Sequence, residues 1–520
     1  MKSILLILGC CLALCLRAWA GPCEDLTKLQ VPHAKITQAA VEQGDGPIAQ
    51  VSASMRDLPP FCRVDAVLTP TADSSIRVEI WMPVEKWNGK FEGTGSGGFA
   101  GSIQYWGLAD GLRRGYAVAN TDMGTAPSTG VDGDALIGHP EKWTDWGMRA
   151  THEMTMAAKA IIRAYYKRAP QRSYFNGCST GGEQGLMEAQ RYPEDYDGIV
   201  SGAPAHYRTR LHMAILWNFV MSEGAPETRI PAPKLPLLAN AVLNACAAQK
   251  AAPTDAFLSL DPARCRWDPQ TLACKAGDRP DCLTAEQVTT AKKIYAGPSN
   301  AATHAAIYPG VEPGSESGWS SFVPENSEAP YGALFKWVFG PQWKWQSFDF
   351  NRDVAKVDAR LGPVLNATSS DLHAFKADGH KLILYHGWAD WLVPSRESLN
   401  YYESVVNANM KDAAEDHRSK LDETRTFMRL FMIPGMAHCG GGPGLNNVEA
   451  LTPLELWVED GVAPESLKAW RDDHGTTTIS RPVCAYPQVA RYDGKGDVNN
   501  ARSFACSAET AKTGAQVEPR

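Results

Sequence analysis

Hydrophobic and polar positions follow two rhythms along this chain. Short apolar runs bounded by turn residues predict β-strands at residues 63–68, 76–82, 116–120, 173–176, 199–201, 381–385 and 427–433. Apolar residues at helical spacing predict helices at residues 146–168, 183–191 and 448–458. Strands that alternate with helices are typical of a parallel sheet with helices on its faces, so the predicted fold class is α/β.

The middle of the chain interrupts this rhythm. Residues 206–368 are rich in proline, alanine and tryptophan, contain four cysteines and show little strand periodicity. Regular patterning returns at residue 381. We therefore predict a sheet domain formed by residues 21–205 and 369–520, with residues 206–368 inserted as a lid.

The first twenty residues have the features of an export signal. Lys2 is followed by an apolar run at residues 4–16 and by the small-residue pattern AWA at residues 18–20. A lipoprotein site at Cys10 is the alternative, although the apolar stretch before it is very short. No later run of about 18 uncharged apolar residues occurs, so we predict an exported (periplasmic or secreted) protein without membrane insertion.

Composition and charge exclude several classes of protein. The 520 residues are 44% hydrophobic and 21% charged, which is inconsistent with a disordered chain, a collagen-like fibre or a coiled coil. The formal net charge is −7, and no basic patch or arm is present. Binding to nucleic acid or to an anionic membrane is therefore not predicted.

The cysteines indicate an oxidised protein. Ten of the thirteen lie beyond the predicted signal: Cys23, Cys62, Cys178, Cys246, Cys265, Cys274, Cys282, Cys439, Cys484 and Cys506. An even number in an exported chain predicts up to five disulfides, while their spacing does not fix the pairs. No CxxC pair occurs, so neither a zinc ribbon nor a thioredoxin-type site is predicted.

A candidate nucleophile lies between a predicted strand and a predicted helix. Residues 177–181 read GCSTG and fit the G-x-S-x-G turn, in which glycines permit a sharp strand-to-helix reversal. Ser179 would then be the nucleophile, and the N–H of Thr180 would point at the developing oxyanion. A glycine-rich turn with an inert serine is the alternative interpretation.

Two later segments could complete a catalytic triad. In this arrangement the acid and then the histidine follow the serine along the chain. Asp390 comes after the predicted strand 381–385, and His438 comes after strand 427–433 in a glycine-rich loop. His417 and His474 also follow Asp390, but their charged surroundings are typical of a solvated surface. We predict the triad Ser179, Asp390 and His438.

The second oxyanion donor is expected in a glycine-rich turn. Residues 93–98 read GTGSGG, and we predict Gly97 as the donor, with Gly95 as the alternative. Cys178 directly precedes the predicted nucleophile and Cys439 directly follows the predicted base. Because triad side chains lie within hydrogen-bond reach, these two cysteines are expected to be close enough for a disulfide.

These motifs together resemble the tannase and feruloyl esterase family, which includes bacterial mono(2-hydroxyethyl) terephthalate hydrolases. The resemblance rests on residues 177–182, 196–204, 385–390, 434–439 and 484–488, and it extends from Cys23 to Cys506. It implies an α/β-hydrolase sheet domain with a large lid. It also implies five disulfides: Cys23–Cys62, Cys178–Cys439, Cys246–Cys265, Cys274–Cys282 and Cys484–Cys506.

The chain departs from the family in its lid. Family lids usually carry a calcium loop of spaced aspartates after the first lid cysteine, whereas here Cys246 is followed by AAQKAA. Asp255 and Asp261 remain, but calcium requires several oxygen ligands. We therefore predict that the calcium site is lost or weakened, and we expect no cofactor or metal in catalysis.

The predicted function is that of a secreted serine carboxylesterase. It would hydrolyse small-molecule esters of aromatic (phenolic) acids, such as feruloyl or galloyl esters, through an acyl-enzyme on Ser179. The tryptophan-rich lid favours a flat acyl group. The alternatives are a terephthalate monoester hydrolase, a serine peptidase or acyltransferase, and a non-catalytic binding protein; the oligomeric state is left open.

Overall fold

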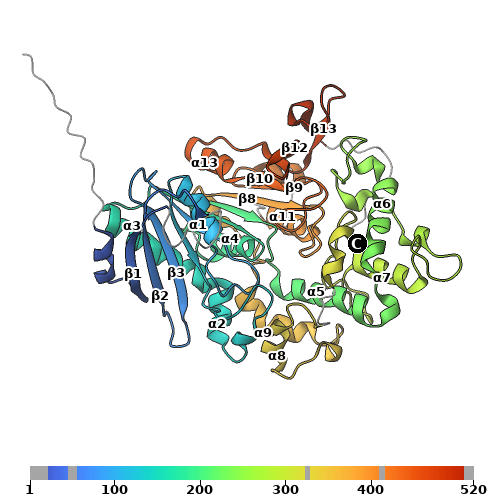
Figure 1. Ribbon diagram of the computed structural model, residues 1–520, viewed down its shortest axis with the longest axis horizontal. Helices are drawn as coiled ribbons and strands as arrows, with labels where there is room; N and C mark the ends of the chain where they lie inside the picture. Colours follow the sequence, from blue (N-terminus) through green and yellow to red (C-terminus); the bar gives the residue numbers. More distant parts are fainter. Residues whose placement is uncertain (1–21, 45–54, 323–327, 409–415, 509–520) are drawn as a thin grey trace, which may run out of the picture.

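The computed structural model describes residues 22–44, 55–322, 328–408 and 416–508, so the predicted signal peptide lies outside the described residues. A nine-stranded sheet forms its centre, in the order β1-β2-β3-β5-β4-β6-β7-β8-β9 (Figure 1). The strands are β1 (Ala34–Glu42), β2 (Phe61–Leu68), β3 (Ile76–Pro83), β4 (Lys90–Thr94), β5 (Ala117–Thr121), β6 (Arg172–Cys178), β7 (Gly198–Gly202), β8 (Lys381–Gly387) and β9 (Met428–Ile433).

Strand direction places several chain turns at one edge of this sheet. β1, β2, β3 and β5 pair antiparallel, whereas every pair from β5 through β4, β6, β7 and β8 to β9 is parallel. The carboxyl ends of the parallel strands therefore meet at the same edge, which is where open α/β sheets form their sites. The predicted α/β class is confirmed.

The apolar runs became strands because both faces of the sheet are covered. α1 (Tyr105–Arg113) and α13 (Leu451–Asp460) pack their buried leucines on one face. α3 (Ala150–Tyr166), α4 (Thr180–Arg191) and α11 (Arg396–Ala408) pack on the other. β1 was missed in the sequence because it lies at the edge and most of its residues are polar or partly exposed.

The long predicted helix has different ends in the structure. Its first turn, Asp145–Arg149, is a π-helical turn that follows the short helix α2 (Pro140–Thr144) and continues into α3. It ends at Tyr166, because Lys167 adopts a left-handed backbone (φ 57°). The predicted end at residue 168 was therefore two residues too late.

The predicted helix 448–458 was wrong at its start. Val448 lies in β10 (Asn447–Glu449), which pairs with β11 (Ser466–Asp473), and α13 begins only at Leu451. The chain then adds β12 (Thr476–Cys484) to this sheet and forms a hairpin from β13 (Gln488–Tyr492) and β14 (Phe504–Ala508). These strands lie above β8 and β9 in Figure 1. Because β11 to β14 follow α13 in the chain, α13 is not the last element.

The α-helices among the described residues between β7 and β8 are α5 (Arg208–Glu223), α6 (Leu235–Ala245), α7 (Ala285–Ala296), α8 (Ala333–Phe339), α9 (Val354–Leu365) and α10 (His373–Ala377). α6 and α7 share a small core of their own and lie to one side of the sheet (Figure 1). α8 and α9 instead join the core that contains α3. The boundaries of the predicted lid at residues 206 and 368 remain predictions.

Among the described residues, we find no helix with both the length and the apolar character that a membrane crossing requires.

Candidate active site

The nucleophile turn follows β6 directly. Ser179 sits between β6 and α4 with φ 65° and ψ −119°, a strained backbone for a residue with a side chain. Its N–H donates to the Gly202 carbonyl at the end of β7 (2.9 Å). Three glycines meet here: a Cβ on Gly95 would lie 2.5 Å from the Gly181 Cα, and one on Gly177 would lie 2.5 Å from the Gly181 oxygen. These glycines therefore allow β4, β6 and α4 to come together.

Replacing Gly95 with alanine is expected to destabilise the protein. The new methyl group would meet backbone atoms that cannot rotate away, and such overpacking typically costs about 1–3 kcal/mol or more in the free energy of unfolding. Gly97→Ala is the matched control, because a Cβ there has no neighbour within 4 Å. Denaturant unfolding of both variants tests this, and equal stabilities would contradict the packing argument.

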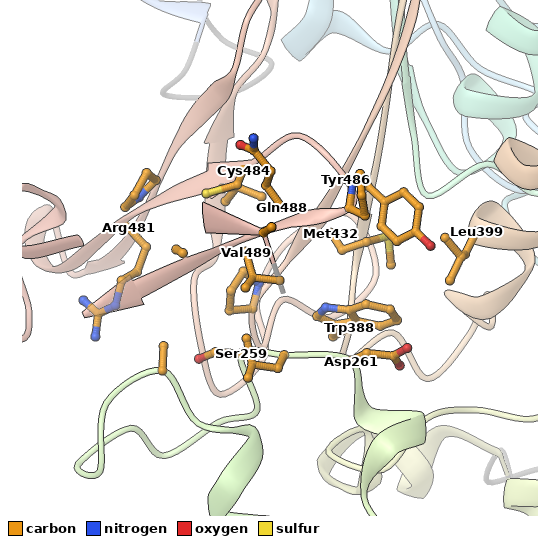
Figure 2. A pocket seen from close by; sticks show the side chains of 18 of the residues that line it. Ser259, Asp261, Trp388, Leu399, Met432, Arg481, Cys484, Tyr486, Gln488 and Val489 are labelled. Atoms are coloured by element: carbon orange, nitrogen blue, oxygen red, sulfur yellow. The ribbon is translucent and has the colours of Figure 1, made fainter. Parts of the chain in front are cut away.

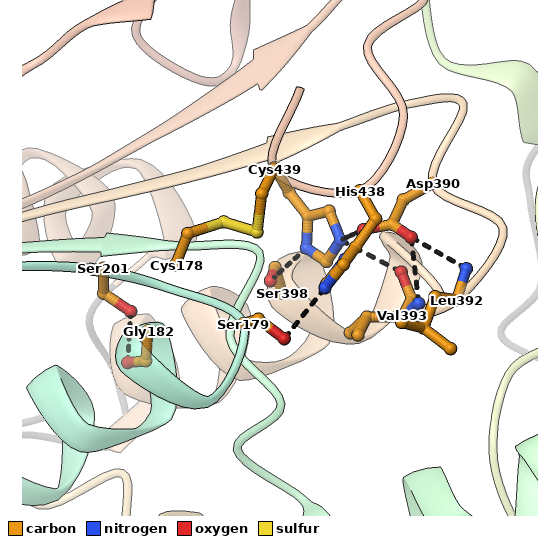
Figure 3. Close-up of a disulfide and its surroundings, with 11 residues drawn as sticks. Cys178, Ser179, Gly182, Ser201, Asp390, Leu392, Val393, Ser398, His438 and Cys439 are labelled. Carbon is orange, nitrogen blue, oxygen red and sulfur yellow. Dashed lines mark hydrogen bonds and ion pairs between the residues drawn. A yellow bond between two sulfur atoms is a disulfide. The ribbon is translucent and has the colours of Figure 1, made fainter. Parts of the chain in front are cut away.

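The structure brings the three predicted triad residues together (Figure 3). His438 Nε2 lies 2.8 Å from Ser179 Oγ, and His438 Nδ1 lies 2.7 Å from Asp390 Oδ2. Asp390 follows β8, His438 follows β9 and Ser179 follows β6. Three parallel strands thus deliver a nucleophile, a base and an orienting acid to one point, which is the geometry of nucleophilic acyl transfer.

Asp390 is fully buried and held by four donors. The backbone N–H groups of Leu392 and Val393 donate to Oδ1, both at 2.9 Å. His438 and His386 face Oδ2. Burial by itself would raise the pKa of Asp390, but the two neighbouring histidines and their hydrogen bonds hold that pKa well below its usual range. The acid therefore stays ionised throughout the pH range in which an esterase would be assayed.

His386 is a second histidine partner of the acid, and the triad prediction did not include it. Its Nε2 faces two acceptors, Asp390 Oδ2 at 3.1 Å and the Val393 carbonyl at 3.0 Å, so Nε2 carries the proton. Nδ1 then accepts from the Ser398 hydroxyl at 2.7 Å. The available signal was a histidine ending a buried strand four residues before the candidate acid.

The predicted disulfide next to the triad is present. Cys178 and Cys439 are bonded, with their Cα atoms 5.9 Å apart (Figure 3). This bond ties the loop of the base to the turn of the nucleophile. The other four pairs implied by the family resemblance are also formed: Cys23–Cys62, Cys246–Cys265, Cys274–Cys282 and Cys484–Cys506.

The hydrogen bonds discriminate between the two candidate oxyanion glycines. The Gly95 N–H donates to the Asn176 carbonyl at 3.0 Å, so it is not free to bind an oxyanion. Within the described part of the chain, the N–H groups of Gly97 and Thr180 have no acceptor. This favours the pair predicted from the sequence, Gly97 and Thr180.

A wide groove is lined by residues that directly follow Asp390 in the chain, although no triad residue itself lines it. It encloses about 810 Å³, and its wall includes Trp391 and Leu392, which directly follow the acid Asp390. The lining also includes Val131 and Asp132, which adjoin Gly130, the acceptor of the Phe99 N–H beside the oxyanion loop. Much of the remaining lining is aromatic: Phe322, Tyr331, Trp343 and Trp345.

A family model described as "Tannase and feruloyl esterase" matches residues 62–507. The chain belongs to this family. An uncharacterized esterase of Xanthomonas campestris pv. campestris is 37% identical over 94% of this chain and 91% of its own length. The mono(2-hydroxyethyl) terephthalate hydrolase of Piscinibacter sakaiensis is 32% identical over 88% and 87%, respectively. The tannase/feruloyl esterase family member described here is therefore a carboxylic ester hydrolase.

A solved structure agrees with this assignment. Feruloyl esterase B from Aspergillus oryzae superposes with a TM-score of 0.82 at 26% identity, covering 93% of this chain and all of that one. The likeness extends beyond the sheet to the chain between β7 and β8, because nearly the whole length is covered. The recognised family and the enzyme class predicted from the sequence are thus confirmed.

The lid loop of this family member does not fit the calcium site that the family implies. The Asp255 carboxylate is buried and accepts from Arg481 Nη2 at 2.9 Å and from the Ala252 N–H at 3.0 Å. Asp261 pairs with Arg396. Figure 2 shows the two sides of this junction, with Ser259 and Asp261 of the lid loop facing the C-terminal strands across a cavity of about 240 Å³. Both remaining carboxylates are thus already paired with arginine guanidinium groups and are not free to bind an ion.

We propose that this loop is held by arginine and needs no calcium. Excess EDTA is expected to leave the melting temperature unchanged within about 1 °C. Arg481→Ala should destabilise the protein by roughly 3–5 kcal/mol, because it leaves the Asp255 charge buried without its partner. Calorimetric scans with EDTA and with added calcium provide the measurement. A fall in melting temperature with EDTA would overturn the proposal.

One other cluster has the composition of a metal site. Ligand atoms of His152, Glu188 and Asp195 lie within 4.8 Å of one another. However, His152 Nδ1 and Asp195 Oδ2 are 2.7 Å apart, closer than the roughly 3.3 Å separating two ligands of a tetrahedral zinc ion. Burial and the neighbouring Asp195 raise the pKa of Glu188 well above its usual value, which disfavours a charged carboxylate ligand there. His152 and Asp195 are therefore partners in a hydrogen bond and not two ligands of one ion.

Proposed function

We propose that this protein is a secreted serine esterase that hydrolyses esters of aromatic, phenolic acids such as ferulic or gallic acid. Ser179 Oγ attacks the ester carbonyl carbon while its proton passes to His438 Nε2. Asp390 holds the imidazole and stabilises its charged form. The imidazolium then gives its proton to the departing alcohol, and a water molecule hydrolyses the acyl-enzyme by the same route.

The continuous chain from Ser179 through His438 to Asp390 carries this proposal. Each distance, 2.8 Å and 2.7 Å, is that of a working hydrogen bond. The N–H groups of Gly97 and Thr180 supply two donors for the oxyanion, and each such donor is typically worth about 3–4 kcal/mol in the transition state. A binding protein would have no need of this complete set, which argues against a non-catalytic role.

The groove supports an aromatic acyl group. Trp391 directly follows the acid in the chain, and Phe322 and Tyr331 line the same groove, so the groove can stack a flat ring. Several relatives are named as probable feruloyl esterases, for example one from Arthroderma benhamiae that is 31% identical over 93% of this chain. Phenolic esters are therefore our first choice of substrate.

One observation favours terephthalate monoesters as the second choice. Lys344 lines the groove, and among the described residues it has no ion-pair partner, whereas Lys336 is engaged by Asp134. An unpaired ammonium group in this position could bind the second carboxylate of such a substrate. Lys344→Ala would then raise KM for a terephthalate monoester and leave KM for methyl ferulate unchanged.

We also propose that the chain is exported and that residues 206–368 act as the lid of the groove. Five disulfides within the described residues suit an oxidising compartment. The groove lies between helix α8, within residues 206–368, and loops of the sheet domain.

The deciding experiment is a substrate panel assayed with purified, oxidised protein. Methyl ferulate, methyl gallate, mono(2-hydroxyethyl) terephthalate, a short aliphatic ester and an amide matched to the best ester would be compared. Turnover of an aromatic ester is expected, with little or none of the amide. Preferred cleavage of the amide would support a peptidase, and turnover of the aliphatic ester alone would refute the aromatic acyl site.

A further inference from the structure

A buried arginine lies beneath the proposed oxyanion hole. Arg208 is the first residue of α5, and its side chain is only 5% exposed. It donates to Thr180 Oγ1 at 3.1 Å and to the Glu183 carboxylate at 3.0 Å. Its guanidinium group also lies over the ring of Trp146, 4.5 Å from the ring centre. The arginine thus joins the start of α5 to the first turn of the nucleophile helix.

Two of the groups that Arg208 contacts converge on one carbonyl of the oxyanion loop. Thr180 Oγ1 donates to the Gly98 oxygen at 2.9 Å, and Trp146 Nε1 donates to the same oxygen at 3.2 Å. On the other side of Gly97, the Ser96 N–H donates to the Gln184 side chain of α4 at 2.8 Å. The residue that supplies the proposed donor is therefore fixed from both flanks.

The hydrogen bonds from Arg208 to Thr180 and from Thr180 to the Gly98 carbonyl form a relay. The number of available protons fixes its direction. Arginine can only donate, so Thr180 Oγ1 accepts from Arg208 and its single proton is left for the Gly98 carbonyl. Without Arg208 the hydroxyl would be free to rotate, and its buried lone pairs would lack a donor. The carboxylate of Glu183 would also be left buried without its ion-pair partner.

We propose that Arg208 is a positioning residue for the oxyanion hole, acting through Thr180 and Trp146 on the loop that carries Gly97. It touches one donor residue, Thr180, directly and reaches Gly98, the neighbour of the other donor residue, through one further hydrogen bond. The proposal rests on the proposed function of the site, because it assigns a role to a group behind the two oxyanion donors.

The test uses variants that interrupt the relay at different points. Arg208→Met combined with Glu183→Gln removes both buried charges together, so that no unpaired ion remains. Thr180→Val keeps the backbone N–H and removes only the hydroxyl. The matched control is Arg210→Met with Asp358→Asn, an ion pair of 2.8 Å two residues further along α5 that contacts no residue of the oxyanion loop.

We expect kcat to fall about 10- to 100-fold in each relay variant, approaching the loss of an oxyanion donor, with KM unchanged within about threefold. Combining the relay substitutions in one protein should lower kcat by no more than the larger of the two separate losses, because both interrupt the same chain of hydrogen bonds. The control should retain its kcat. Counts of active sites by exhaustive phosphonate labelling correct for any misfolded fraction.

A purely structural role would give another result. The melting temperature would fall while kcat per labelled site stayed unchanged, or the losses of the relay variants would multiply; either outcome overturns the proposal. The rate at which an aryl phosphonate labels Ser179 is measured in parallel, because its charged oxygen also needs the oxyanion hole. That rate tests Arg208 even if the wild-type protein turns over no aromatic ester, an outcome that would refute the proposed substrate class alone.

Discussion

Ser179→Ala is expected to lower kcat for an aromatic ester by about 10⁴- to 10⁶-fold. The substitution removes the oxygen that accepts the acyl group and leaves His438 without the proton it would take at 2.8 Å. The residual rate would come from the oxyanion hole and from substrate binding, which do not involve Oγ. The fold should persist, because the Ser179 N–H bond to Gly202 belongs to the backbone.

The measurement is steady-state hydrolysis of methyl ferulate, supported by labelling with a fluorophosphonate probe. Ser201→Ala is a suitable control, since it removes another buried hydroxyl from the same region, one that donates to the Gly182 carbonyl at 2.7 Å. That variant should be labelled and active, with only a modest loss of stability. A Ser179→Ala protein that kept more than about 1% of the wild-type rate would exclude Ser179 as the nucleophile.

Asp390→Asn should produce the second largest effect, a fall in kcat of roughly 10⁴-fold. The two backbone N–H groups of Leu392 and Val393 would hold the amide oxygen where Oδ1 now lies. The amide NH₂ would then face two ring nitrogens that at present donate protons to Oδ2. His438 would have to move its proton to Nε2, and in that tautomer it could no longer accept the proton of Ser179.

This prediction has a close control in the same chain. Asp195→Asn makes the same change in another buried aspartate that bonds a histidine, His152, at 2.7 Å, away from the triad. It should cost stability but leave kcat per folded molecule intact. The Asp390→Asn protein should still bind substrate with a similar KM. Equal kcat values for the two variants would show that Asp390 does not orient the catalytic base.

Local sequence was sufficient for the triad and for most of the parallel sheet. The strands that became β6, β8 and β9 are apolar runs buried on both faces, and such runs are visible without any knowledge of their neighbours. Ser179, Asp390 and His438 each follow one of these strands, and parallel strands necessarily end at the same edge.

The elements that sequence reasoning missed depend on partners far along the chain. β1 has little strand-like alternation of its own, is largely exposed, and becomes a strand because β2 pairs with it. Val448 was assigned to a helix by its apolar spacing, but pairing with Ala469 in β11 places it in a sheet. In both cases a tertiary contact overrode the local pattern, which cannot encode a partner's position.

The sequence by itself determined the fold class, the order of Ser179, Asp390 and His438 along the chain and the adjacency of Cys178 and Cys439 to two of them, because each of these is written in short segments. Only the tertiary structure decided that the Gly95 N–H donates to the Asn176 carbonyl, that His386 faces the Asp390 carboxylate, and that Arg208 donates to Thr180 behind the oxyanion loop. Those outcomes depend on which donor reaches which acceptor. Those distances are set by how the folded chain packs, and no local pattern of residues records them.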